Sequence, residues 1–101
     1  MKVRVYFCKE HDIQSYILRK SRLSRQALDT IYDLVWECEF KNILNVGKIW
    51  LKFIEHEKNP FGVTLRSKRS HNRIATGDII QVANEFYVVD RIGIRKIRVS
   101  D

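Results

Sequence analysis

Apolar and polar side chains alternate near the N-terminus and again in residues 32–40, which predicts two half-buried strands. In residues 2–8 the alternation puts Val3, Val5 and Phe7 on one face. In residues 32–40 it breaks only at Val35, and five apolar side chains share one face: Tyr32, Leu34, Trp36, Cys38 and Phe40. Three shorter strands are expected over 78–82, 86–90 and 94–99, joined by turns at 83–85 and 91–93.

A spacing of three to four residues between apolar side chains predicts helices in the remaining segments. The main helix is expected over about 43–57, with Asn42 as its N-cap and Pro60 beyond its end. One or two short helices are expected over 12–30, where Asp12 can cap the first and a break falls near Ser21. Residues 59–76 have no steady period, and we expect a long loop whose middle is free to move.

Together these elements predict one α+β domain over residues 1–101, because this length leaves no room for two domains. We expect an antiparallel sheet of about five strands that packs one face on the helix at 43–57, with the 12–30 helices at its edge. The expected core consists of ten apolar side chains: Val5, Leu34, Trp36, Phe40, Val46, Ile49, Trp50, Phe53, Ile80 and Val88.

The composition is that of a soluble globular protein, since 45% of the residues are hydrophobic and 31% are charged. No apolar run approaches the ~20 residues of a membrane span, and the charged N-terminus is unlike a signal peptide. The two cysteines, Cys8 and Cys38, lie among large apolar residues and are expected to be packed thiols. We therefore expect a cytoplasmic protein that does not associate with a membrane.

Positive charge is concentrated in three segments of a chain whose net charge is +7. Residues 13–28 and residues 66–73 each contain four cationic side chains and no acid. The last expected strand and the turn before it add Arg91, Arg95, Lys96 and Arg98. Such clusters attract phosphate backbones or acidic protein surfaces, although they can also serve only to keep a protein soluble.

From this charge we expect non-specific binding of RNA or DNA, in which the 66–73 loop and the C-terminal strand contact phosphates. Tyr6 and Tyr87 could stack on bases if both are exposed on the same sheet. The candidate binding residues are Arg66, Lys68, Arg69, His71, Arg73, Tyr87, Arg95, Lys96 and Arg98. The alternative partner is an acidic host protein, which the chain would inhibit or modulate stoichiometrically.

Catalytic and metal-binding motifs are not found in the sequence. The three histidines lack the spacing of metal ligands, and no phosphate-binding glycine loop or Gly-x-Ser-x-Gly motif occurs. One enzymatic alternative is a small RNase toxin, with His71 as acid or base, the cations Arg69 and Arg73 as stabilisers of the phosphate charge, and Tyr87 beside them. Because nothing in the sequence links these residues, we expect a non-enzymatic protein that needs no metal and no cofactor.

Two glycines and an aspartate are expected to shape turns. Gly77 and Gly93 can adopt positive φ before or between the short strands. Asp78 can accept hydrogen bonds from the backbone of its own turn. We expect this structural role rather than a catalytic one, because the sequence pattern puts no histidine or second acid near Asp78.

Three segments carry a family resemblance. They are the strand Tyr-x-Leu-Val-x-x-x-Glu-Phe at 32–40, the helix at 46–53, and a Gly77-Asp78 motif followed by the pairs Phe86-Tyr87 and Gly93-Ile94. In this order and spacing they resemble the YodL-like small domain of phage, plasmid and conjugative-element proteins. Arg73 and Ala75 stand where that family has two serines. The resemblance implies a phage or mobile-element origin and brings no established activity with it.

Overall fold

The structure is a computed structural model that describes residues 1–10, 20–42 and 45–100. Its elements confirm the α+β class. In chain order they are β1 (Lys2–Cys8), β2 (Arg22–Ser24), α2 (Arg25–Ile31), β3 (Tyr32–Glu39), α3 (Val46–Glu55), the short 3-10 helix η1 (Pro60–Gly62), β4 (Ile79–Val82), β5 (Glu85–Asp90) and β6 (Gly93–Ser100). The expected helix start at Asp12 lies outside the described residues.

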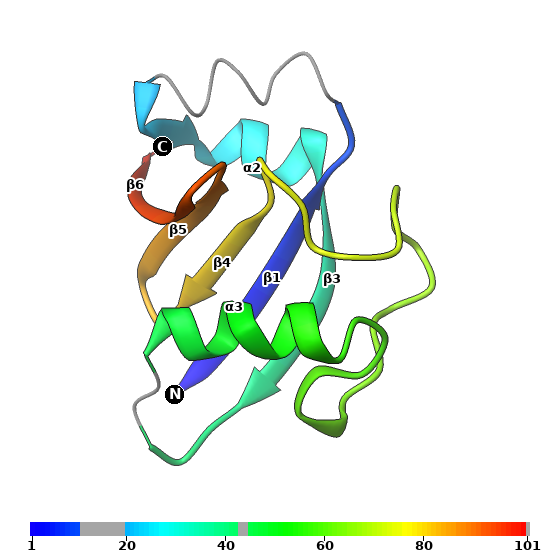
Figure 1. Ribbon diagram of the computed structural model, residues 1–101. Helices are drawn as coiled ribbons and strands as arrows, with labels where there is room; N and C mark the ends of the chain where they lie inside the picture. The colour runs from blue at the N-terminus through cyan, green and yellow to red at the C-terminus, as the bar shows by residue number, and fades with distance from the viewer. Residues whose placement is uncertain (11–19, 43–44, 101) are drawn as a thin grey trace.

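One sheet of six strands in the order β2-β6-β5-β4-β1-β3 forms the centre of the described chain (Figure 1). Every neighbouring pair is antiparallel except β2 and β6, which are parallel. The sequence-based prediction of an antiparallel sheet of about five strands is therefore corrected to a mixed sheet of six. The strand that the sequence did not predict is β2, which has only three residues and is too short to show a period of its own.

A β-bulge at Val35 divides β3 into two halves that face opposite sides of the sheet. The register to β1 passes directly from Trp36 to Leu34, so Val35 has no cross-strand partner. An extra residue in one strand reverses the direction of the side chains beyond it. Tyr32 and Leu34 accordingly pack on one face and Trp36 on the other. The prediction that the apolar side chains of residues 32–40 share one face is wrong. The bulge lies at Val35, the residue at which the alternation in the sequence breaks.

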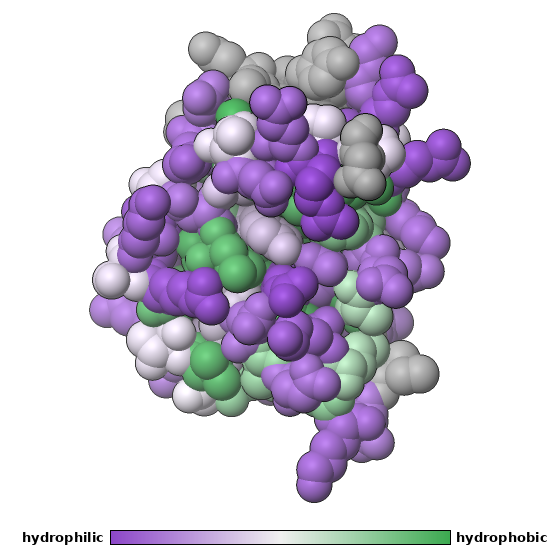
Figure 2. Space-filling view, turned by 180° about the vertical axis from the view of Figure 1, so that it is seen from behind, coloured by the Kyte–Doolittle hydropathy of each residue, from purple (hydrophilic) through white to green (hydrophobic). Residues whose placement is uncertain are grey.

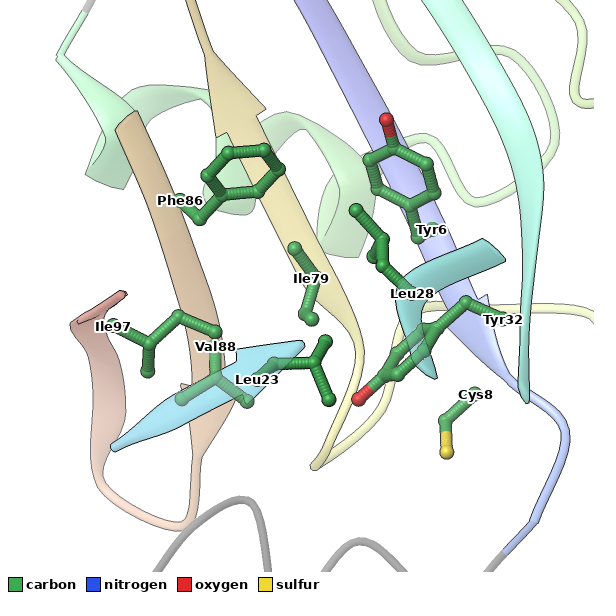
Figure 3. Close-up of a cluster of buried hydrophobic side chains, with 9 residues drawn as sticks. All are labelled: Tyr6, Cys8, Leu23, Leu28, Tyr32, Ile79, Phe86, Val88 and Ile97. Carbon is green, nitrogen blue, oxygen red and sulfur yellow. The ribbon is translucent and has the colours of Figure 1, made fainter. Parts of the chain in front are cut away.

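Both faces of the sheet are covered, whereas the sequence predicted one. The face under α3 contains Val3, Val5, Phe7, Val35, Trp36, Ile49, Phe53, Leu65 and Ile80. The opposite face, covered by α2 and β2, contains Tyr6, Cys8, Leu23, Leu28, Tyr32, Ile79, Phe86, Val88 and Ile97 (Figure 3). Six of the ten predicted core residues are buried, and the other four are partly buried against these clusters: Leu34, Phe40, Val46 and Trp50.

Side-chain caps fix where the two α-helices begin. Ser24 accepts a hydrogen bond from the Ala27 amide at the start of α2, and Asn45 accepts one from the Gly47 amide at the start of α3. The N-cap of α3 is therefore Asn45 and not Asn42, and the helix is shorter than the predicted 43–57. It ends at Glu55, before Pro60, as the sequence indicated.

Candidate functional site

The predicted binding residues fall into two groups at opposite edges of the sheet. Arg66, Lys68, Arg69, His71 and Arg73 lie on the loop after η1, which is attached to the edge strand β3 through the Arg66 amide and the Val35 carbonyl, 2.8 Å apart. Arg95, Lys96 and Arg98 lie on β6, next to the opposite edge strand β2 (Figure 1). The loop and the C-terminal strand therefore do not form one continuous basic surface.

On the loop side, Asp78 is fully buried and accepts hydrogen bonds from two other segments. Its Oδ1 accepts from the Cys8 amide at 2.8 Å, and its Oδ2 accepts from the Ala75 amide at 2.7 Å. The same Oδ2 lies 2.8 Å from Nε2 of His71. Burial raises the pKa of the Asp78 carboxyl above its ordinary value, although the hydrogen bonds from His71 and the backbone oppose that shift. Gly77, just before it, has a φ of 95°.

His71 links the loop to β1. Its ring is stacked on Phe7 with 4.3 Å between centroids, and its Nδ1 lies 2.8 Å from Oγ of Ser70. The Ser70 hydroxyl donates to the Cys8 carbonyl at 3.1 Å. The middle of the loop is thus tied to β1, and the expectation that it is free is wrong. So is the expectation that no histidine lies near Asp78, because a contact across a loop of irregular backbone leaves no periodic signal in the sequence.

His71 lies between Ser70 and Asp78 and is within hydrogen-bonding distance of both, but this arrangement does not activate the Ser70 hydroxyl. The single hydroxyl proton of Ser70 is directed at the Cys8 carbonyl, so His71 Nδ1 must donate to Ser70 and not accept from it. An activated serine needs the opposite arrangement, in which the histidine accepts its proton. With Nε2 facing a carboxylate, both ring nitrogens of His71 are engaged.

The four residues of the RNase alternative each interact with a group outside the set, and Arg69 donates to the Arg66 carbonyl. His71 faces the buried Asp78, and Arg73 pairs with Glu57 at 3.2 Å. Tyr87 lies on β5 and donates to Glu85 at 2.8 Å. This arrangement gives the enzymatic alternative no support.

At the opposite edge, four cations line a single depression of about 430 Å³, which we call the basic hollow: Lys20, Arg22, Lys96 and Arg98, together with Ser21 and Ile97. The parallel register pairs Arg22 with Arg98, so these two side chains lie side by side on the same face of the sheet. Lys96 is two residues before Arg98 and shares that face. No acidic side chain is among the described residues that line the hollow.

Ser21 lines the basic hollow and connects it to β6 through hydrogen bonds. Ser21 has a φ of 57°, a left-handed conformation that is uncommon for a residue other than glycine. Its carbonyl accepts from the Arg98 amide at 3.1 Å, and its Oγ accepts from the Arg95 guanidinium at 2.6 Å. Sequence reasoning named Arg98 and Lys96 but missed Lys20 and Arg22, for which the only signal was the excess of cations in residues 13–28.

The two tyrosines proposed for base stacking have different positions. Tyr87 is partly exposed on β5. Tyr6 is buried in the cluster on the α2 side and donates to Gln81 at 2.8 Å, and burial raises the pKa of its hydroxyl (Figure 3). Base stacking by Tyr6 was expected only if its ring is exposed, and that condition is not met.

Comparison of the chain with protein-family models, with curated proteins and with solved structures gives no match. The YodL-like resemblance and the cytoplasmic location stay predictions. Within the described ranges, the side chains of His, Cys, Asp and Glu form no group of three that could hold a metal ion. None of the described helices has the length and hydrophobicity needed to cross a bilayer.

Proposed function

We propose that the protein binds RNA or DNA without sequence specificity and that the basic hollow is its main phosphate-binding surface. The observation that carries this proposal is the convergence of Lys20, Arg22, Lys96 and Arg98 on one depression. Cations placed side by side displace counterions from a phosphate backbone, and that release drives non-specific binding. Contacts of this kind carry no sequence information.

The 66–73 loop is the weaker candidate surface. Arg73 is paired with Glu57, and Arg69 donates to the carbonyl of Arg66 at 2.6 Å. Two of the four loop cations are thus paired within the protein and gain less from a phosphate, whereas in the hollow it is Lys96 that pairs, with Glu85 at 3.1 Å. We infer that the loop adds secondary contacts at most, and that Arg66 and Lys68, both exposed, would make them.

On the side of the molecule away from α3, the surface favours a charged partner over an apolar one, whereas the α3 side exposes Leu51 and Ile54. The face seen from behind carries mainly hydrophilic side chains, with small and separate hydrophobic areas between them (Figure 2). A stable interface with a protein usually contains a continuous apolar centre. The YodL-like resemblance adds that this nucleic-acid binder would be an accessory protein of a phage or mobile element, which is proposed on the resemblance alone.

Two matched triple variants test the proposal. One replaces Arg22, Lys96 and Arg98 of the basic hollow with Gln, and the other replaces Arg66, Lys68 and Arg73 of the loop with Gln. Both remove three positive charges, so a difference between them reports position and not net charge. Fluorescence anisotropy with a labelled oligonucleotide, repeated over a salt series, measures affinity and its salt dependence.

We expect the hollow variant to bind at least about tenfold more weakly and to lower the slope of log K against log salt by about 2, as the loss of three contacts to a single strand predicts. The loop variant should change affinity by less than about threefold. Equal losses in the two variants would mean that only net charge matters. Failure of the parent protein to bind at ~50 mM salt would refute nucleic-acid binding and favour the acidic host protein.

A further inference from the structure

We propose that the ligand of the basic hollow is single-stranded, because Lys96 of the hollow is the cross-strand partner of Tyr87, on whose ring an unpaired base can stack. This inference rests on the proposed function and specifies its substrate class.

The register of β5 and β6 places Tyr87 next to the cations. Tyr87 and Lys96 are direct cross-strand partners, and opposite residues have their β-carbons ~5 Å apart. Arg98 follows Lys96 on the same face, and Arg22 lies beside Arg98. One aromatic ring and three cations therefore form a continuous row across three adjacent strands.

This part of the sheet is outside the core that α3 covers. The cluster under α3 takes its members from β1, β3, β4, α3 itself and the connecting loops, and includes no described residue of β5 or β6. Tyr87 is accordingly partly exposed on that face. A base inside a duplex has both faces covered by its neighbours, so only an unpaired base can stack on such a ring.

Glu85 holds the ring and the neighbouring ammonium in place. Its two carboxylate oxygens accept from the Tyr87 hydroxyl at 2.8 Å and from Nζ of Lys96 at 3.1 Å. Side chains already fixed before binding lose less conformational freedom when the ligand arrives. The negative charge beside the ring also disfavours a phosphate there, which leaves the ring to a base while phosphates lie over Arg22 and Arg98.

The test compares three ligands of equal length: a single strand, the same strand paired in a duplex, and a strand whose sugars lack bases. The proteins are the parent, Tyr87→Leu, Tyr87→Phe and Tyr87→Trp, at one fixed salt concentration. We expect Tyr87→Leu to bind the single strand at least about fivefold more weakly and to bind the duplex and the abasic strand as the parent does. Tyr87→Phe and Tyr87→Trp should keep binding the single strand, since both retain a flat ring.

The outcomes separate this inference from the function on which it rests. If the parent binds the duplex as tightly as the single strand, or if Tyr87→Leu weakens all three ligands equally, the single-strand inference is wrong and phosphate binding stands. If Tyr87→Leu does not fold, a Tyr87→Phe or Tyr87→Trp protein that binds the single strand no better than the abasic strand overturns it. Binding of none of the three ligands by the parent refutes the proposed function itself.

Discussion

At the scale of single residues, Asp78 connects β1, its own turn and the loop through one carboxylate. In Asp78→Ala the amides of Cys8 and Ala75 lose their acceptor. Because buried donors left without a partner are costly, we expect the free energy of unfolding to fall by about 3 kcal/mol. Urea unfolding measures this. Asp29→Ala, at an exposed position of α2, is the control and should change stability by less than about 0.5 kcal/mol. Similar values for the two variants would contradict the role of Asp78.

The pH dependence of stability tests whether the pKa of the Asp78 carboxyl is raised in the folded protein. Burial raises the pKa of Asp78 in the folded protein, so its contribution to stability is fully present below the ordinary pKa of aspartate. That contribution is lost as the pH rises through the raised pKa. Asp78→Asn cannot titrate, so the parent should lose stability relative to this variant as the pH is raised from about 3 to about 6. Urea unfolding of both proteins at several pH values measures the difference. If the parent instead gains stability relative to Asp78→Asn as the pH rises, the hydrogen bond from His71 lowers the pKa of Asp78 by more than burial raises it.

At the scale of elements, the two tryptophans have unequal roles. Trp36 on β3 is 1% exposed, and its Nε1 donates to the Val63 carbonyl at 2.9 Å, whereas Trp50 on α3 is only partly buried. We expect Trp36→Ala to cost about 3–5 kcal/mol, which a small domain would survive poorly. Trp50→Ala should cost less, about 1–2 kcal/mol. Thermal unfolding of the two variants measures the order, and a larger loss for Trp50→Ala would contradict the packing of α3.

The elements that sequence reasoning located are those with a sustained period. The strands over Lys2–Cys8 and Tyr32–Glu39, the helix over Val46–Glu55 and the C-terminal strands all lie where the pattern indicated. What it missed depends on contacts between distant residues. The bulge at Val35 keeps Trp36 and Tyr32 on different faces, and β2 is a strand because it pairs with the distant β6. Neither contact has a local period.

At the scale of the whole molecule, the strand order decides which charges meet. Sequence reasoning grouped the cations of 66–73 with those of β6, but the fold separates these groups by most of the width of the sheet. The fold instead pairs Arg22 with Arg98 on neighbouring strands, although these residues are 76 positions apart in the sequence. The sequence therefore predicted the kinds of side chain at the candidate site, cations and a tyrosine, but it did not predict that Lys20 and Arg22 belong to it.

The position of β1 inside the sheet has a consequence for the way the protein is made. β1 lies between β3 and β4, and its pairing with β4 joins Val3 to Val82. While the chain leaves the ribosome, β1 and β3 can form a hairpin-like pair early, but the other side of β1 has no partner until β4 follows. An apolar strand with one unpaired side recruits other chains. We therefore expect the nascent chain to be most prone to aggregation between the synthesis of β1 and that of β4, before the sheet closes.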